Sequence, residues 1–301
     1  MDRLAAMTVF LAVVEAGSFS AASRKLAMPL ATVSRNVSEL ETHLKARLLN
    51  RSTRKLTLTD AGRDYLAACK RILEDVGEAE RIVSGEFSTP KGELVITAPI
   101  VFGRLHVLPV IADFLKAYPE VDVRLVQSDR IANLLEDHVD LAVRVGELPD
   151  SNLSATRVAM IRRVSCASPE YFAAHGLPST PQELAAHQCI TFDALGSAYS
   201  WSFVVDGAQL LVPVHSRLVV NTAEAAIDAA LAGVGITRVL SYQVEAARRE
   251  GLLTLALQDF EPAPFPVSLV YSSQRRLPLK LRAFLDFAAP RLRERLPAGA
   301  R

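Results

Sequence analysis

Hydrophobic residues between positions 19 and 58 follow the spacing of two short helices and a hairpin. The segment 30–44 repeats them at intervals of four, three and four, which predicts one buried helix face: Val33, Val37, Leu40 and Leu44. A shorter helix is expected over residues 21–26 with Ser20 as its cap, because a hydroxyl can accept a free N–H at a helix start. Pro29 separates the two, since proline cannot continue a helix. The pattern predicts a helix-turn-helix.

The opposite face of the segment 30–44 carries small or hydrogen-bonding side chains and one arginine. These are Ala31, Thr32, Ser34, Arg35 and Ser38. Side chains of this kind allow a helix to approach base edges in a major groove. We therefore expect this face, together with Ser20 at the preceding turn, to contact DNA.

A basic hairpin is predicted directly after this helix. Between residues 43 and 58 there are five basic residues and no acidic one, and Arg51, Arg54 and Lys55 fall between Leu49 and the strand-like residues 56–58. Basic residues at a hairpin tip are expected to bind phosphates, which supplies affinity but little sequence information. The alternative is a solvated charged loop. Together with the helices, the hairpin favours an all-α-plus-wing winged helix-turn-helix domain over residues 1–59.

The segment 60–91 is expected to be a linker. Apolar residues occupy the a and d positions of a short heptad pattern, at Leu66, Cys69, Leu73 and Val76. Fewer than three clean heptads leave two interpretations open: a dimer-forming helix, or an amphipathic helix packed on its own domain. Residues 85–92 contain two glycines and a proline and are expected to form the hinge.

The remaining chain, residues 92–301, alternates strand-like and helix-like segments. Strands are expected at 94–97, 121–126 and 139–145 with a helix at 105–118, and a second unit begins near residue 163 with a hairpin at 201–212, a helix at 222–232, strands at 252–257 and 266–271, and a helix at 280–296. Such alternation predicts a mainly parallel sheet with helices on both faces. Ligands of open α/β sheets bind at the carboxyl ends of the strands.

Composition narrows these possibilities. A length of 301 residues suggests about two domains. Residues 1–60 hold nine Lys or Arg against five Asp or Glu, whereas the rest of the chain is slightly acidic. A basic head on an acidic body fits a DNA-binding domain attached to another function. Three scattered cysteines predict neither a zinc site nor a disulfide framework, and no apolar run is long enough for a membrane span, so a cytoplasmic protein without metal or cofactor is expected.

The first 62 residues resemble the DNA-binding domain of the LysR-type bacterial transcriptional regulators. The resemblance rests on Val9-Phe10, Glu15-Ala16-Gly17-Ser18-Phe19-Ser20, Thr32-Val33-Ser34-Arg35, Leu40-Glu41, Leu48-Leu49 with Arg51, and Leu58-Thr59 with Ala61-Gly62. One departure is Pro29-Leu30, where many members have Ser-Gln; Leu30 cannot make a bidentate contact to adenine.

The resemblance, looser beyond residue 62, implies the remaining architecture. It implies a dimerising linker helix and a C-terminal α/β, two-lobed, periplasmic-binding-protein-like sensor. Lobe one would comprise residues 92–162 and 266–301, and lobe two residues 163–265. The implied partners are promoter DNA, a small-molecule effector, and further copies of the chain in a dimer or dimer of dimers, with RNA polymerase as a candidate contact.

Effector contacts are expected at strand ends and helix starts facing the cleft between the lobes. The candidates are Pro99, Ile100, Val101, Phe102, Ser128, Arg144, Gly146, Trp201, Asn221 and Thr222. Two helix starts and an arginine favour an anion, most simply an organic or aromatic carboxylate. Arg144 could equally form a surface ion pair, and Trp201 could fill the core of its lobe instead.

Two other classes of protein are weighed against a regulator. An enzyme is disfavoured because the sequence lacks a Gly-x-Ser-x-Gly elbow, a Walker loop and a Gly-x-Gly-x-x-Gly motif, and its six histidines lack metal-ligand spacing. A metabolite sensor that acts on a protein partner remains an alternative. We expect a regulator that is not an enzyme.

Overall fold

The computed structural model describes residues 1–296 apart from 52–55, 85–88, 131–133, 135–138, 150–151, 193–198 and 274–276; the side chains of 51, 75, 78 and 81–84 are also not described. The chain divides into two compact units, Met1–Ser88 and Thr89–Arg301. This division falls inside the segment 85–92, where the hinge is expected.

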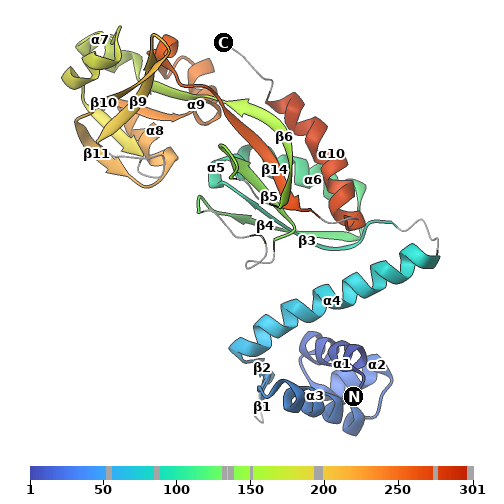
Figure 1. The fold of residues 1–301 in the computed structure, drawn as a ribbon. Helices are drawn as coiled ribbons and strands as arrows, with labels where there is room; N and C mark the ends of the chain where they lie inside the picture. The colour runs from blue at the N-terminus through green and yellow to red at the C-terminus, as the bar shows by residue number, and fades with distance from the viewer. Residues whose placement is uncertain are drawn as a thin grey trace. The chain divides into compact units, whose positions relative to one another are not determined.

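The first unit is a three-helix cluster followed by a small hairpin and a long helix (Figure 1). Its elements are α1 (Arg3–Ala16), α2 (Phe19–Leu26), α3 (Leu30–Leu44), β1 (Leu49–Arg51), β2 (Leu56–Leu58) and α4 (Asp60–Ser84). α1 supplies Val9, Phe10 and Val13 to a core that α3 completes with Val33 and Val37. The antiparallel pairing of β1 with β2 gives the predicted hairpin.

The start of α4 is held tightly against the hairpin. The Thr59 hydroxyl accepts from the Gly62 N–H at 2.9 Å and donates to the Arg47 carbonyl at 2.6 Å. A Cβ at Gly62 would collide with the Leu48 carbonyl, so only glycine permits this approach. This contact is the physical reason for the Leu-Thr-x-Ala-Gly pattern read from the sequence.

Lobe one of the second unit is built on a five-stranded sheet of order β4-β3-β5-β14-β6. Its elements are β3 (Gly92–Ala98), α5 (Ile100–Phe102), the π-helical turn η1 (Gly103–Val107), α6 (Leu108–Ala117), β4 (Val121–Gln127), β5 (Leu141–Val145), β6 (Leu153–Ile161), β14 (Phe265–Ser272) and α10 (Leu279–Arg295). β4, β3 and β5 are parallel. β14 runs antiparallel to both neighbours because it returns from lobe two, so the sheet is mixed and the prediction of a mainly parallel sheet is only partly correct.

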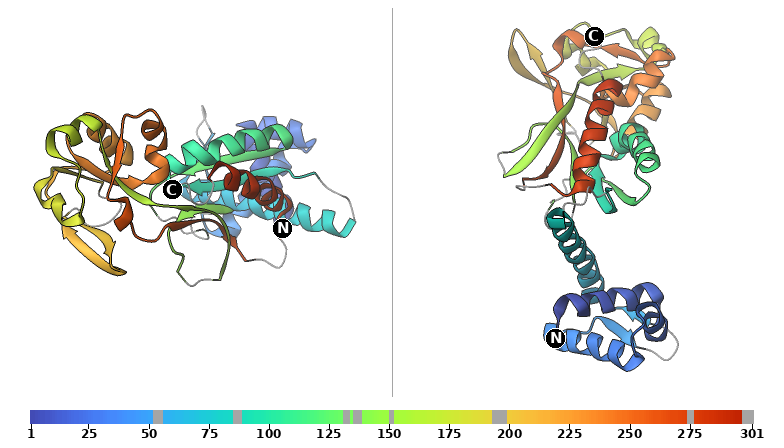
Figure 2. Two further views of the ribbon diagram at one scale, coloured as in Figure 1. Left: turned by 90° about the horizontal axis from the view of Figure 1, so that it is seen from above. Right: turned by 90° about the vertical axis from the view of Figure 1, so that its right-hand side faces the viewer.

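Both described long helices of lobe one lie on the same face of its sheet (Figures 1 and 2). Phe114 of α6 and Phe284 of α10 pack at 5.0 Å between ring centroids over Leu94 and Ile96. On the opposite face of the sheet, Leu134 packs against Ala142. The residues on either side of Leu134 lie outside the described residues, and the prediction of a helix on that face falls there.

Lobe two is built on a second sheet, of order β11-β8-β12-β7-β13. Its elements are β7 (Arg163–Ala167), α7 (Pro169–His175), η2 (Pro181–Ala186), β8 (Cys189–Phe192), β9 (Ser200–Val205), β10 (Ala208–Pro213), β11 (Ser216–Val220), α8 (Ala223–Leu231), β12 (Ile236–Leu240), α9 (Ser241–Arg249), β13 (Thr254–Ala256) and η4 (Gln258–Phe260). The β9–β10 hairpin turns at Asp206 and Gly207, both with positive φ, as predicted.

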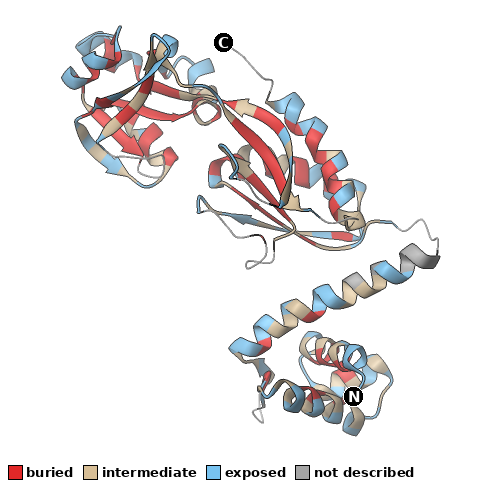
Figure 3. Ribbon diagram, in the orientation of Figure 1, coloured by how far each residue is buried: buried red, intermediate tan, exposed pale blue. Residues whose placement is uncertain are grey.

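The central strands of both sheets are buried, as Figure 3 shows. One hydrophobic cluster runs from β3, β5 and α6 of lobe one to β12 and α9 of lobe two. Among the described residues no helix is both long and apolar enough to cross a membrane.

Candidate functional site

The helix α3 begins at Leu30 and ends at Leu44, as predicted. Val33 and Val37 are fully buried, Leu40 is almost so, and Leu44 packs at the edge of the same core. This stripe fixes the rotation of α3 about its axis. The opposite face is therefore presented to solvent by the packing of the first unit.

The outward face of α3 carries the predicted DNA contacts. Ala31 and Arg35 are exposed, whereas Thr32, Ser34 and Ser38 are half-buried. The Arg35 side chain is 72% exposed, and its guanidinium Nε lies 3.9 Å from the Glu39 carboxylate. An exposed pair at this distance is weak, so Arg35 can leave Glu39 for a phosphate or a base at little cost.

The predicted role of Ser20 as the cap of α2 is wrong. α2 begins at Phe19, and the cap is Ser18, whose hydroxyl accepts from the Ala21 N–H at 3.1 Å. Ser20 is an exposed residue of the first turn. Gly17, in the left-handed conformation, ends α1 directly before Ser18 and so moves the cap two residues earlier.

The base of the hairpin is fixed by a carboxylate of α3. Glu41 Oε1 accepts from the backbone N–H groups of Leu48 and Leu49 at 2.8 and 3.1 Å. The predicted phosphate contacts Arg54 and Lys55 lie outside the described residues, as does the side chain of Arg51. The structure thus defines where the hairpin starts and returns.

The linker residues divide into two groups along α4. Cys69 has no exposed surface and belongs to the core of the first unit, and Leu66 packs against that core. Burial raises the pKa of Cys69 to about 11, so its thiol stays protonated at neutral pH. Of the two interpretations left open for this helix, packing on its own domain holds at Cys69, and its assignment to the dimer linker is wrong because the core of its own unit covers it. Leu73 and Val76, one to two turns further along, are half-buried.

The helix that follows β3 begins earlier than predicted. Helical structure starts at Ile100 rather than Leu105, and it passes through the π turn η1 into α6. The Ile100 N–H donates to the Asp129 carboxylate at 3.1 Å. The chain itself therefore places a negative charge at this helix start, where an anionic effector was expected.

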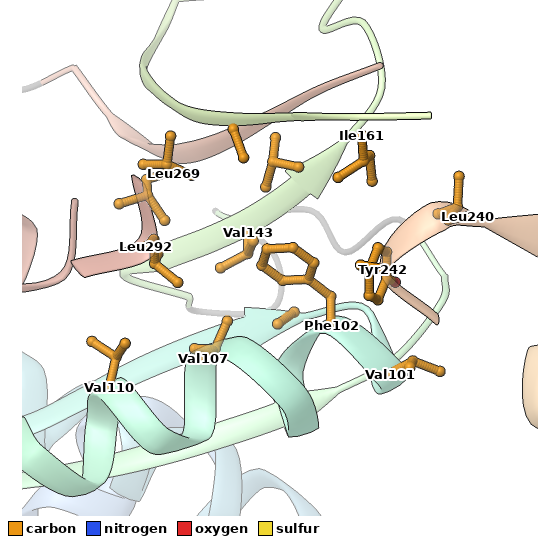
Figure 4. Close-up of a cluster of buried hydrophobic side chains, with 14 of the residues drawn as sticks. Val101, Phe102, Val107, Val110, Val143, Ile161, Leu240, Tyr242, Leu269 and Leu292 are labelled. Atoms are coloured by element: carbon orange, nitrogen blue, oxygen red, sulfur yellow. The ribbon is translucent and has the colours of Figure 1, made fainter. Parts of the chain in front are cut away.

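Val101 and Phe102 do not line an open wall. Figure 4 shows the Phe102 ring between Val143 and Tyr242. Phe102 has no exposed surface, and its ring lies 5.3 Å from that of Tyr242 in α9. The prediction that these two residues contact an effector is corrected: both are buried in the hydrophobic cluster that spans the lobes, where Phe102 contacts Tyr242.

The predicted positions in lobe two also separate. Thr222 caps α8, its hydroxyl accepting from the Ala225 N–H at 3.3 Å, and Asn221 beside it is exposed. Trp201 is buried with Tyr171 and Phe203 in the core between the sheet and the β9–β10 hairpin. Trp201 is therefore a core residue and not a cleft residue.

The strand ends of lobe one carry the remaining candidates. Ser128 follows β4, and its hydroxyl accepts from the Arg130 N–H at 3.1 Å. Arg144, near the end of β5, is half-buried, and desolvation lowers its pKa. Gly146 follows with φ +113°, a conformation that favours glycine. Pro99 caps the helix that starts at Ile100.

The sequence did not single out four residues around the junction of the lobes: His106, Asp129, Glu224 and Tyr242. The rings of His106 and Tyr242 are 5.5 Å apart. Burial raises the pKa of Tyr242, and the negative charges of Asp129 and Glu224 raise it further. For Asp129 and Glu224 the sequence signal was their position, since Asp129 follows a strand end and Glu224 lies in the first turn of α8.

Comparison with protein families finds two models that together cover most of the chain. Residues 4–63 match the model described as bacterial regulatory helix-turn-helix protein, lysR family. Residues 88–293 match the LysR substrate binding domain.

Similar proteins extend over nearly the whole chain. The HTH-type transcriptional regulator CrgA of Neisseria meningitidis serogroup B is 38% identical over 290 residues, covering 95% of this chain and 96% of that protein. The HTH-type transcriptional activator AaeR of Escherichia coli K12 is 33% identical, with coverages of 95% and 93%. The solved structure of CrgA has a TM-score of 0.62 at 36% identity, covering 95% of this chain and 98% of that one. The full-length structure of AphB, a virulence activator of Vibrio cholerae, has a TM-score of 0.61 at 29% identity, with coverages of 95% and 98%.

Proposed function

The chain belongs to the LysR family of bacterial transcriptional regulators, and we propose that α3 reads promoter DNA while a small organic or aromatic carboxylate, bound between the lobes, changes the output. The observation that carries the DNA-reading half is the division of α3 into two faces. Val33 and Val37 are fully buried, while Arg35 opposite them is 72% exposed. A helix held this way can enter a major groove without unfolding any part of its domain.

The proposed DNA contacts are the outward face of α3 and the hairpin. Short side chains at Ala31, Thr32, Ser34 and Ser38 let the helix axis come close to the bases, and Arg35 supplies a donor for guanine or phosphate. The basic residues Arg51, Arg54 and Lys55 are proposed to bind phosphates.

A carboxylate effector is supported by the charge and burial of Arg144. A partly desolvated guanidinium gains more from an anion than an exposed one does, because little water competes for it. The N-terminus of α8 at Thr222 adds a favourable dipole. Asp129 at the start of the other helix opposes an anion there, so the proposed contacts are Ser128, Arg144, Gly146, Asn221 and Thr222, with Pro99 and Ile100 as apolar neighbours.

The proposed assembly is a symmetric dimer or a dimer of dimers through α4. Two reading helices related by a two-fold axis match a palindromic site. Leu73 and Val76 of α4 are only half-buried in a single chain, which leaves apolar surface for a partner helix.

The DNA-reading proposal is tested by selecting binding sites from random duplex DNA with the full-length protein. We expect one motif with two-fold symmetry, and Arg35→Ala should recover a motif with relaxed preference at one position in each half. Selection that enriches no motif would contradict the proposal.

The effector proposal is tested by a thermal-shift screen of carboxylates, amines and neutral metabolites. We expect carboxylates alone to stabilise the protein, and Arg144→Ala to remove the response while operator binding without effector is retained. Thr222→Ala should also remove the response to the effector. Thr222→Ser, which keeps the hydroxyl that caps α8, is its structural control. A cationic effector would overturn the proposed chemistry but leave the DNA-reading proposal intact.

A further inference from the structure

Two arginines of lobe two lie side by side on one face of its sheet, away from the candidates discussed above. β7 and β12 are antiparallel, with Arg163 opposite Leu240 and Ser165 opposite Arg238. Arg163 and Arg238 are thus diagonal neighbours, whose side chains stand on the same face. The positive charge of Arg163 is close enough to contribute to lowering the pKa of Arg238, after the larger effect of burial.

Both guanidinium groups are packed against aromatic rings. Arg238 is 5% exposed, and its Cζ lies 4.4 Å from the centre of the Phe203 ring. The Cζ of Arg163 lies 5.0 Å from the centre of the Phe265 ring. The face of a ring stabilises a cation but accepts no hydrogen bond from the N–H groups in the plane of the guanidinium. These N–H groups therefore still need hydrogen-bond acceptors.

Each arginine keeps one buried donor without a partner. The Nη2 of Arg238 donates to the Ser202 carbonyl, but its Nε and the Nε of Arg163 are buried with no hydrogen-bond acceptor. The nearby carboxylate of Glu261 pairs through Oε2 with Arg162 at 3.0 Å, and its Oε1 is itself without a partner. Among the described residues, three guanidinium groups share this one carboxylate, and an excess of buried positive charge is costly unless it is compensated.

We propose that Arg163 and Arg238 form a binding site for a small monocarboxylate in lobe two, separate from the proposed effector site at Arg144. The two unpartnered Nε–H donors, one from each arginine, match the two oxygens of one carboxylate group. The rings of Phe203 and Phe265 provide apolar surroundings for the rest of such a molecule. A single negative charge offsets part of the excess positive charge without requiring a further cation.

Arg162, next to Arg163 in the chain, borders a cavity. This side chain lines a cavity of about 420 Å³ together with Ser241 and Arg248. Neither arginine of the pair lines this cavity, but Arg162 holds Glu261, whose negative charge acts on Arg238. Glu261 is then the internal competitor of the ligand, since its negative charge also faces the arginines.

The test uses isothermal titration of the full-length protein with benzoate, and with inorganic phosphate at equal ionic strength. We expect saturable benzoate binding that Arg238→Met and Arg163→Met each weaken at least tenfold, and that Glu261→Gln tightens. Arg217→Met, an exposed arginine of β11 in the same lobe, is the matched control and should bind as the parent does. Without ligand, Arg238→Met should melt at or above the temperature of the parent, because it removes a buried charge.

Three outcomes would overturn the inference. Absence of benzoate binding in the parent, together with a lower stability of Arg238→Met, would make the arginines structural. Binding of phosphate in place of benzoate would contradict the carboxylate assignment. Binding that is lost in Arg144→Ala and kept in Arg238→Met would place the carboxylate in the cleft, which supports the proposed effector site and refutes this one. The inference shares with the proposed function only the choice of an anionic ligand, so its failure would leave the DNA-reading proposal intact. The control Arg217→Met is expected to bind operator without ligand as the parent does.

Discussion

Arg35 is the side chain on which the DNA-reading proposal depends most directly. It projects from the exposed face of α3, and its contact with Glu39 at 3.9 Å between exposed groups contributes little to folding. Its substitution should therefore separate DNA binding from stability.

Arg35→Ala is expected to lower operator affinity at matched salt by about 1–3 kcal/mol if the contact is to a base. Fluorescence anisotropy with operator DNA measures the loss, and the melting temperature should stay that of the parent. Lys116→Ala, a similarly exposed cation paired with Asp113 in the second unit, is the matched control. Equal affinity of Arg35→Ala and the parent would refute the assignment.

Ser18 and Ser20 provide a paired test of the start of α2. Because the Ser18 hydroxyl satisfies the Ala21 N–H, Ser18→Ala should destabilise the protein by roughly 1 kcal/mol. Ser20→Ala should change stability by less than about 0.5 kcal/mol, since Ser20 is exposed and caps nothing. Urea unfolding of the full chain compares the two; a larger loss for Ser20→Ala would restore the cap expected from the sequence.

At the scale of elements, α4 performs two tasks along its length. Its first turns, through Leu66 and Cys69, complete the core of the first unit. Its later turns present Leu73 and Val76 with part of their surface uncovered. The heptad pattern therefore combines a segment that packs in the core with a segment proposed for helix pairing. The sequence alone could not separate the two, because core packing and helix pairing use the same apolar residue types at the same spacing.

Leu73→Glu should convert the oligomer to monomers, because a carboxylate would have to be buried in the proposed seam without a partner. Ile72→Glu, one residue earlier and 39% exposed, lies off the seam and should keep the parental oligomer. Sedimentation velocity distinguishes the two variants. An unchanged oligomer in Leu73→Glu would mean that the chains associate through another surface.

At the scale of the whole sensor, the two lobes meet at a cluster of rings. Phe102 and His106 of lobe one contact Tyr242 of lobe two. An effector changes output only if it binds one arrangement of the lobes better than another. The contacts at this junction stabilise the arrangement seen here, so they contribute to the free energy that an effector must supply to change it.

We expect His106 to make the stability of this junction depend on pH. Burial, followed by the charge of Arg295, lowers its pKa from 6.5 to about 4, and its Nε2 is buried without a hydrogen-bond partner. The rings of Phe102 and Tyr242 also face it. Between about pH 6.5 and pH 4 the unfolded chain binds the extra proton, so stability falls as pH falls through this window.

The loss assigned to His106 is at most about 3 kcal/mol. His106→Phe, which keeps a ring at the junction, should lose less stability than the parent between neutral pH and about pH 4. His215→Phe, at an exposed position, should behave as the parent does. Melting temperatures across this range measure the difference; parallel curves for parent and His106→Phe would show that His106 does not carry the effect.

The sequence by itself determined the elements whose evidence is local. The bounds of α3 follow from the period of Val33, Val37 and Leu40 and from Pro29 before them, and the β9–β10 hairpin follows from Asp206-Gly207. The helix-turn-helix could be identified from the same local evidence. Once the buried stripe of the helix is assigned, the residues of its outward face are assigned as well.

Tertiary structure decided every feature that depends on residues distant in the sequence. Phe102 reads as a cleft residue from its place after β3, but Tyr242, 140 positions later, covers it. Asp129 reaches Ile100 across a strand and a helix, and Arg163 meets Arg238 only because β7 and β12 pair. Strand ends indicate where a ligand site is expected. The exposure of side chains there depends on which distant segment packs against them, and a single sequence carries no local signal for that packing.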